Sequence, residues 1–150
     1  TYINQKYGFQ FIYPNTGVIT SSSENFAHMI LPIYPGTNLV EKYLDVTVFE
    51  NVPTCTSPLT QGYAPGGFSS ETVIINGVQF VKESGQEAGA GQIYDWVAYS
   101  TQKGNACASM SFVLHSTNPS NYPSPPPFYN KTVESAVFTE IMSTFSWMLP

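Results

Sequence analysis

The sequence contains no arginine and has few charged residues of any kind. Only 10% of its 150 residues are charged, whereas about 25% are charged in typical soluble domains. Ten acidic residues outnumber the five lysines, which gives a net charge of -5. Because phosphate binding requires clustered basic residues, this composition excludes nucleic acid as a partner and disfavours docking on anionic lipid. Hydroxyl and amide side chains supply the polarity instead, as they do in many extracellular proteins.

Long apolar segments are missing as well. No run of about eighteen apolar residues exists, so we expect no membrane insertion. No signal peptide is present, and the sequence starts at Thr1 without methionine, which we interpret as a processed mature chain. A length of 150 residues predicts a single domain, residues 1–150, with a substantial core.

Cysteine is scarce, since Cys55 and Cys107 are the only two in the chain. Neither lies in a Cys-x-x-Cys pair, which argues against a zinc site and against thioredoxin-like chemistry. An even number of widely spaced cysteines favours one disulfide, formed in an oxidising compartment. Two buried free thiols are the alternative. We therefore expect a secreted protein with an extracellular or cell-surface location.

The most regular stretch of the sequence is residues 6–14, which predicts a half-buried strand with a period of two. One side of this strand is aromatic, with Tyr7, Phe9, Phe11 and Tyr13. Pro14 ends it, because proline cannot donate to a strand ladder. The alternation already begins at Ile3, so residues 1–6 are a possible N-terminal arm. Such an arm either pairs with another chain or pairs within its own chain.

Most of the remaining chain has the composition of strands and turns. Residues 71–84 form the clearest hairpin, because Asn76-Gly77 favours a type I′ turn between two apolar runs. The long loop at residues 53–70 contains Cys55, and the expected disulfide would staple it. We expect a helical turn at residues 38–42 and a flexible glycine-rich loop at residues 85–92. Further strands are expected at residues 18–20, 26–31, 43–52, 93–101, 107–115 and 145–149.

One amphipathic helix is predicted at residues 131–143. Apolar residues recur there at helical spacing, namely Val133, Ala136, Val137, Ile141 and Met142. Asn130 is a good N-cap, and Glu134 lies in the first turn, where the helix dipole favours it. Antiparallel strands with one C-terminal helix predict an α+β domain. We expect an antiparallel β-sheet of about six to eight strands with the helix on one face.

Several short motifs carry a family resemblance. Residues 6–14 contain a Tyr-Gly-Phe-x-Phe-x-Tyr-Pro pattern, and Gly104-Asn105-Ala106-Cys107, residues 112–118 and Ser143-Thr144-Phe145 follow further on. This series resembles the landmarks of PsbP/Mog1-like domains, especially those of secreted bacterial proteins and lipoproteins. The resemblance implies a sheet covered by a helix and a protein that is not an enzyme. It does not identify a ligand.

The histidine and carboxylate residues that could bind a metal or act in catalysis do not cluster in the sequence. His28 and His115 lie on expected strands without a neighbouring ligand residue, so we interpret both as structural. Glu83, Glu87 and Asp95 surround the glycine-rich stretch, where a weak calcium site is one interpretation. The alternating Asp/Asn pattern of a calcium loop is missing, which favours a solvated loop. We expect no metal, no cofactor and no catalytic residue.

Aromatic residues in the expected loops are candidates for contacts with a partner. Side chains of this kind suit protein contacts or sugar stacking, but they can equally fold back over the sheet. Asn130-Lys131-Thr132 is a possible glycosylation site, although the same asparagine is the expected helix cap. The candidate contact aromatics are Tyr63, Phe68, Tyr122, Phe128 and Tyr129.

These observations favour a non-enzymatic structural protein that assembles outside the cell. The expected partner is a copy of the same chain, as in a filament or surface homopolymer, or another extracellular protein. An extended arm can add a strand to the sheet edge of a neighbour, and a head-to-tail repeat of that contact gives a filament. The alternative is a secreted binding module for a protein, a sugar or a small apolar ligand. The arm residues are Thr1, Tyr2, Ile3, Asn4 and Gln5.

Overall fold

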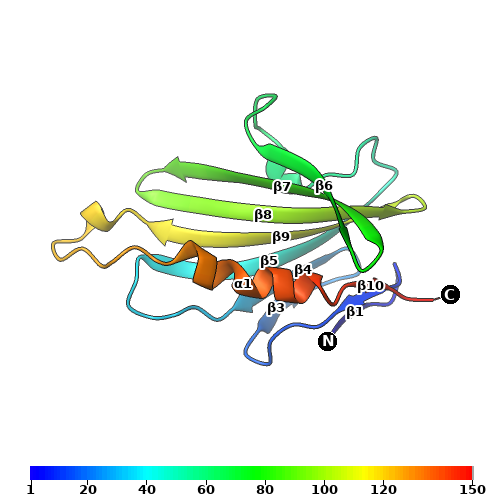
Figure 1. Cartoon of the computed structure of the whole chain (residues 1–150), viewed down its shortest axis with the longest axis horizontal. Coiled ribbons are helices and arrows are strands. Elements are labelled where there is room, and N and C mark those ends of the chain that lie inside the picture. Colours follow the sequence, from blue (N-terminus) through cyan, green and yellow to red (C-terminus); the bar gives the residue numbers. More distant parts are fainter. Residues whose placement is uncertain (150) are drawn as a thin grey trace.

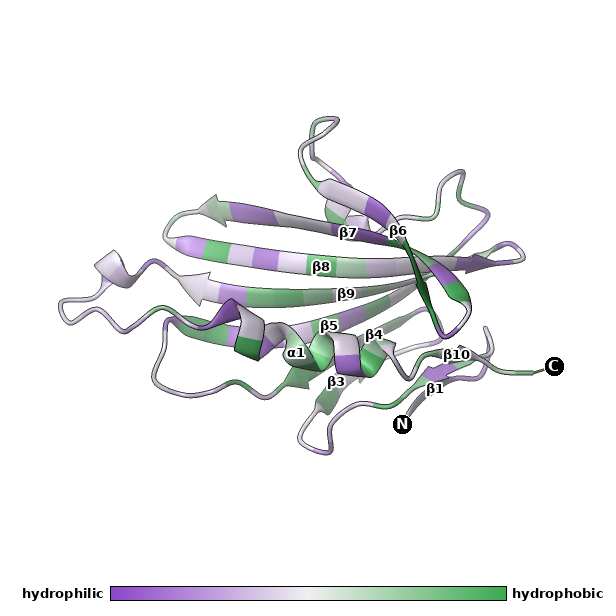
Figure 2. Ribbon diagram, viewed as in Figure 1, coloured by the Kyte–Doolittle hydropathy of each residue, from purple (hydrophilic) through white to green (hydrophobic). Residues whose placement is uncertain are grey.

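A seven-stranded antiparallel sheet forms the body of the protein, which the computed structural model describes for residues 1–149 (Figure 1). Its strands are β3 (Val18–Ser22), β4 (Phe26–Leu31), β5 (Leu39–Glu50), β6 (Ser69–Ile75), β7 (Val78–Gly89), β8 (Gln92–Lys103) and β9 (Ala106–Thr117). The strand order is β3-β4-β5-β9-β8-β7-β6, so β9 is the central strand. Apolar residues occupy much of β9 (Figure 2), and nearly all of its side chains are buried. Both of its faces are therefore covered.

A small three-stranded sheet closes one end of the core. It contains β1 (Tyr2–Asn4), β2 (Phe9–Phe11) and β10 (Ser146–Trp147), in the order β1-β2-β10. The rings of Phe9 and Phe145 stack with their centroids 5.6 Å apart. The first and last strands of the chain, β1 and β10, both pair with β2 and therefore lie in the same sheet (Figure 1).

Helix α1 (Lys131–Met142) covers one face of the large sheet (Figure 1). The Asn130 side chain caps it by accepting a hydrogen bond of 3.1 Å from the backbone N–H of Val133. Apolar and polar residues alternate along the helix (Figure 2), and Phe138 stacks on Phe112 of β9 at 4.6 Å. The main core lies between this helix and the sheet, and its large buried side chains include Phe80, Met29, Leu44, Met110, Leu114 and Ile141.

A buried ion pair joins the helix to the sheet. The Lys42 ammonium on β5 lies 2.9 Å from Glu134 Oε1, and the exposed fractions of the two side chains are 4% and 2%. The same ammonium donates to the Glu134 backbone carbonyl at 2.9 Å. The backbone N–H of Tyr34 donates to the second carboxylate oxygen at 3.2 Å. Each charge therefore has several partners, as burial of an ion requires.

The loop at residues 53–68 covers part of the opposite face of the sheet. A disulfide between Cys55 and Cys107 of β9 attaches this loop at a sequence separation of 52 residues, as the sequence predicts. In the chain-entropy model a closed loop of this length stabilises the fold by about 4 kcal/mol. The backbone N–H of Ser57 donates to Glu83 of β7 at 2.9 Å. Burial raises the pKa of the Glu83 carboxyl above its ordinary value.

Trp96 of β8 is the centre of this second packed layer. Its indole N–H donates to the Tyr63 hydroxyl at 3.0 Å, and Phe68 packs beside both rings. The indole lies across Gly85 on β7, where a Cβ atom would be 2.8 Å from the ring. The glycine at this position is therefore required by the close approach of the tryptophan ring.

The α+β architecture predicted from the sequence is confirmed, as are the Asn76-Gly77 hairpin and the helix with its Asn130 cap. The prediction of a flexible loop at residues 85–92 is wrong. β7 and β8 continue through this region, and only Ala90 and Gly91 turn, with φ angles of 53° and 76°. Gly85 makes room for the Trp96 ring, and Gly91 forms a tight turn, so these glycines do not indicate a flexible segment.

Two further expectations about local structure are wrong. The helical turn expected at residues 38–42 is absent, because Asn38 pairs with Thr117 and β5 starts at the next residue. The first strand is shorter than residues 6–14, because Tyr7 and Gly8 lie in the turn between β1 and β2. Gly8 has a φ of 73° there, a conformation that glycine adopts without strain.

Removal of the Glu134 carboxylate should destabilise the protein strongly. The change Glu134→Ala leaves the Lys42 ammonium buried without its partner, which costs about 3–5 kcal/mol. Denaturant unfolding measures the loss, and Glu140→Ala on the exposed side of the same helix should change stability by less than about 0.5 kcal/mol. The double change Lys42→Met with Glu134→Leu should cost less than Glu134→Ala alone. Equal stability of the Glu134 and Glu140 variants would contradict this role of the pair.

An alanine at position 85 should disturb the layer around Trp96. The change Gly85→Ala forces the new methyl group against the indole, and overpacking of this kind costs about 1–3 kcal/mol. Gly89→Ala is the matched control on the same strand, because a Cβ there meets nothing within 4 Å. Thermal unfolding and tryptophan fluorescence should change in the first variant alone. If both variants behave like the wild type, the close packing of Trp96 on Gly85 is refuted.

Candidate functional site

The residues proposed as an assembly arm lie in the small sheet. Tyr2 pairs with Phe11 and Asn4 pairs with Phe9, so β1 is joined to its own chain. The side chains of Tyr2 and Asn4 are buried, while Ile3 is 44% exposed between them. Thr1 and Gln5 are exposed at the two ends of this strand. The structure thus has the intrachain pairing that the sequence left open as an alternative.

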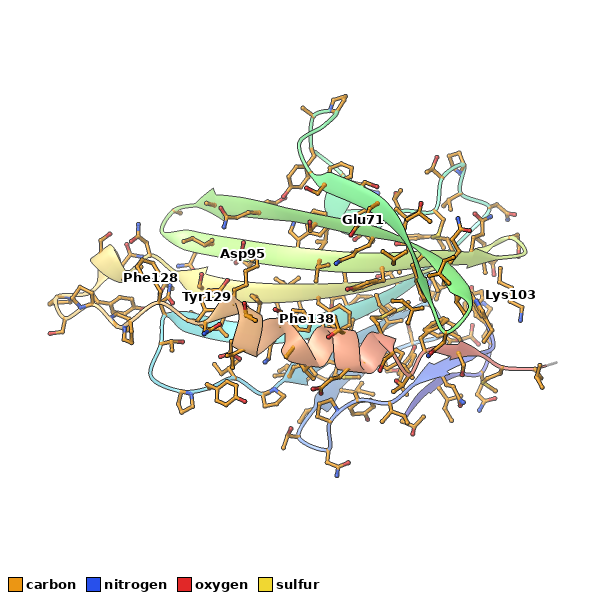
Figure 3. The ribbon with its side chains drawn as sticks, viewed as in Figure 1. Glu71, Asp95, Lys103, Phe128, Tyr129 and Phe138 are labelled. Carbon is orange, nitrogen blue, oxygen red and sulfur yellow. A yellow bond between two sulfur atoms is a disulfide. The ribbon has the colours of Figure 1, made fainter. Side chains whose placement is uncertain are left out.

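Three of the five candidate contact aromatics fold back over the sheet. Tyr63 and Phe68 pack on Trp96, and Tyr129 donates a hydrogen bond of 2.6 Å to Asp95. Phe128 is 75% exposed on the loop before α1 (Figure 3), and Tyr122 is 43% exposed. Only these last two remain available for contacts with a partner.

The remaining candidate residues do not gather into one centre. Residues 1–149 contain no group of three or more His, Cys, Asp and Glu side chains able to hold a metal ion. Glu83 points to one face of the sheet beside Ser57, whereas Asp95 points to the helix side. Glu87 is exposed on β7. Asn130 is exposed and caps α1, so its side chain has a structural role whether or not it carries a glycan.

A cleft lies between α1 and the part of the sheet that the helix leaves uncovered. Its volume is about 290 Å³, close to the smallest typical ligand pockets. In Figure 3, Asp95 and Tyr129 lie together near the start of the helix, and Phe138 lies further along it. The cleft lies beside these residues, over β7 and β8.

Apolar side chains form the floor of the cleft. Val97 and Tyr99 come from β8, Leu114 comes from β9, and Phe138 comes from α1. Their positions follow from the period of two along the strands, which directs alternate residues of β8 and β9 to the helix side. Phe138 and Leu114 are only 2% exposed. The floor is therefore fixed by the packing of the core.

Polar side chains form the walls. Lys82 and Ser84 stand on β7, while Lys131, Ser135 and Thr139 stand on α1. The Lys82 ammonium is 3.8 Å from Glu71 Oε1 on β6, and the exposed fractions of the two side chains are 35% and 65%. Such a solvent-exposed pair contributes little to stability. Two of the five lysines of the chain therefore line one small cleft.

Asp95 closes the cleft near the start of the helix and already has its own partners. One of its oxygens accepts a hydrogen bond of 2.8 Å from Gln86 and lies 3.5 Å from the Lys131 ammonium. Its other oxygen accepts the hydrogen bond from the Tyr129 hydroxyl. Burial and then this hydrogen bond raise the pKa of Tyr129, so the phenol stays a donor. Asp95 therefore stabilises the wall of the cleft rather than offering a free base.

Neither lysine of this site is predicted from the sequence as a binding residue. Lys82 and Ser84 share one face of β7 because they alternate with Val81 and Glu83, but the strand was expected to end at Ser84. Lys131 at the helix start was noted only as part of a glycosylation motif. The alternation of polar residues along β7 was the available signal, and only the tertiary structure brings that strand opposite the helix.

Comparison with known proteins gives a fold and no family. No protein-family model matches the chain, and no curated protein matches its sequence. Among solved structures, LpqN, involved in cell envelope biogenesis of Mycobacterium tuberculosis, is similar with a TM-score of 0.54 and 10% identity, over 94% of this chain and 83% of LpqN. A Bacteroides thetaiotaomicron protein is similar with a TM-score of 0.57 and 14% identity, over 94% of this chain.

The chain spans about half the length of the Bacteroides protein, 45% of which is covered. Identities of 14% and 10% establish a shared fold and nothing about activity. The resemblance to PsbP/Mog1-like domains stays a prediction, because neither comparison names that family. No helix within residues 1–149 has the length and apolar character needed to cross a membrane.

Proposed function

We propose that the chain is a secreted, non-enzymatic binding domain that holds a small organic anion with an apolar body in the cleft between α1 and β7–β8. The observation that carries the proposal is the pair of lysines, Lys82 and Lys131, on opposite walls of an apolar floor. An ammonium group on each wall suits a carboxylate or sulfonate head group. The floor of Val97, Tyr99 and Phe138 suits a ring or a short alkyl chain.

The overall charge makes the lysine pair informative. In a chain with a net charge of -5, the two lysines in one cleft provide a local site for an anion. The other lysines lie elsewhere: Lys6 pairs with Glu24, Lys42 is buried against Glu134, and Lys103 lies over the Trp147 ring. Attraction at the cleft therefore arises from specific residues rather than from a general positive surface.

The proposed location is extracellular or at the cell surface of a bacterium. The disulfide between Cys55 and Cys107 fits an oxidising compartment. LpqN, which shares the fold, is involved in cell envelope biogenesis. Membership of the PsbP/Mog1-like domains is part of the same proposal, and it rests on the short motifs of residues 6–14 and 104–107.

Two fluorescent probes with the same apolar body test the cleft. Anilinonaphthalene sulfonate carries an anionic group, whereas phenylnaphthylamine lacks it. We expect the anion to bind the folded protein more tightly, and the double change Lys82→Gln with Lys131→Gln to weaken it by about tenfold or more, equivalent to about 1.4 kcal/mol. Binding of the neutral probe should hardly change, because the lysines contribute through their charge. Fluorescence titration measures both affinities.

Two control variants locate the probe. Lys103→Gln removes a lysine near the turn between β8 and β9, far from the cleft in Figure 3, and should leave both affinities unchanged. Ser135→Phe fills the cleft and should weaken both probes. Circular dichroism verifies that each variant is folded. Equal binding of the anion to the wild type and to the Ser135→Phe variant would show that the cleft is not the site.

A second candidate function, self-assembly, is supported by the edges of the large sheet. β6 is one edge strand, with Ile74 72% exposed and Glu71 as its only charged residue. The other edge, β3, has no charged residue. Edges with few charges are open to pairing with another chain. We propose that copies join through β6 and β3 rather than through the arm, which would build a filament.

Single lysine substitutions distinguish the two assembly surfaces. Ile74→Lys places a charge on the β6 edge and should keep the protein monomeric, whereas Ile3→Lys in the arm should not affect assembly. Deletion of residues 1–5 is a poorer test, because it removes the buried side chain of Tyr2. Light scattering after size-exclusion chromatography over a range of concentrations gives the mass. A wild type that stays monomeric at every concentration would eliminate self-assembly, and an effect of Ile3→Lys alone would favour the arm.

A further inference from the structure

A second cavity lies on the opposite face of the sheet from the cleft. It has a volume of about 210 Å³ and opens beside the loop that the disulfide attaches. Its lining is dominated by aromatic rings and contains one carboxylate. The lining residues are Tyr43, Leu59, Glu87, Tyr94, Trp96 and Val113.

The Tyr94 ring, which forms one wall of this cavity, is held in place by His115. The rings of Tyr94 and His115 stack at 4.3 Å with an angle of 9° between their planes. Both nitrogens of His115 have partners, since Nδ1 lies 2.7 Å from Glu41 Oε1 and Nε2 lies 2.5 Å from Gln92 Oε1. The histidine therefore cannot rotate freely, and it fixes the plane of the tyrosine ring.

The Tyr43 wall repeats this arrangement on the neighbouring strands. The His28 ring packs on Tyr43 with centroids 4.9 Å apart, and His28 Nδ1 lies 2.5 Å from Asp45 Oδ1. The third ring, Trp96, is held by its hydrogen bond to Tyr63. Three rings are thus fixed before any ligand arrives, and such preorganisation lowers the cost of binding.

The surroundings of the cavity are electronegative. Glu87 lines it, while Glu41 and Asp45 lie behind its walls as partners of the histidines. No lysine lines it. Burial, followed by the nearby carboxylates of Asp45 and Glu41, raises the pKa of Tyr43 to about 12. The carboxylates of Glu87, Glu41 and Asp45 therefore disfavour a further negative charge at this cavity.

We propose that this cavity binds a small quaternary ammonium group. The faces of aromatic rings attract a cation through their quadrupoles, and quaternary ammonium ligands are commonly held in cages of such rings. Tyr43, Tyr94 and Trp96 provide the rings, and Glu87 provides the opposite charge at the rim. The proposal goes beyond the anion-binding cleft, because it involves the other face of the sheet and the opposite charge.

Calorimetric titration with choline and with dimethylbutanol, its uncharged carbon analogue, tests the proposal. The two probes have the same shape, so a preference for choline of about tenfold or more measures the contribution of the charge. Tyr94→Leu should remove most choline binding. Glu87→Gln is a milder change at an exposed residue, should leave the fold intact, and should weaken choline binding several-fold. Equal affinity for the two probes, or no binding of choline, would overturn the proposal.

Controls separate this site from the cleft and identify the source of the ammonium group. Glu24→Gln removes an exposed carboxylate elsewhere, and Lys82→Gln alters the cleft, so neither should change choline binding. Loss of choline binding in either variant would count against the cavity. Cosedimentation with phosphatidylcholine vesicles that is lost in Glu87→Gln would support a lipid head group as the source. Binding of free choline without cosedimentation would support a small soluble ligand.

Discussion

The position of helix α1 depends on one buried ion pair. Lys42 and Glu134 are almost completely removed from water, and such charges are tolerated only with their partners in place. Apolar packing alone tolerates small shifts of a helix on a sheet, because it is not directional. The ion pair does not tolerate such shifts. The Lys42 ammonium donates to both the side-chain carboxylate and the backbone carbonyl of Glu134, so the helix must keep one position relative to β5. The helix is therefore held over β5 and β9, and a cleft remains beside it over part of β7 and β8.

The two faces of the large sheet are covered by different kinds of element. A twelve-residue helix cannot cover seven strands, so an open cleft follows from its size and position. The opposite face is covered by a loop with one short 3-10 helix (Pro58–Thr60), and the disulfide attaches this loop to β9. That loop packs on Trp96, and its Leu59 lines the cavity together with Tyr43 and Tyr94. Each covering element is incomplete, and a cavity lies at the margin of each one.

The sequence predicts most of the strands because their alternation is a local property. The helix and its cap are predicted for the same reason, and the even number and wide spacing of the cysteines favour the disulfide over two free thiols. Prediction from the sequence fails where the role of a residue depends on a contact with a residue distant in the chain. Gly85 indicates flexibility in the sequence, yet it accommodates the indole of Trp96. Lys82 and Lys131 are 49 residues apart by number (131 − 82), and only the fold places them on one cleft.

The pleat of β8 supplies both candidate binding sites. Val97 and Tyr99 point to the helix side and form the floor of the cleft, while Tyr94 and Trp96 point to the other side and form the aromatic cavity. Because alternate residues face opposite ways, Tyr99 lines only the cleft and Tyr94 only the cavity, whereas Trp96 borders both. The two linings also differ in charge, since two lysines and Asp95 line the cleft whereas Glu87 is the only charged residue that lines the cavity. One rigid strand can therefore support two chemically distinct sites.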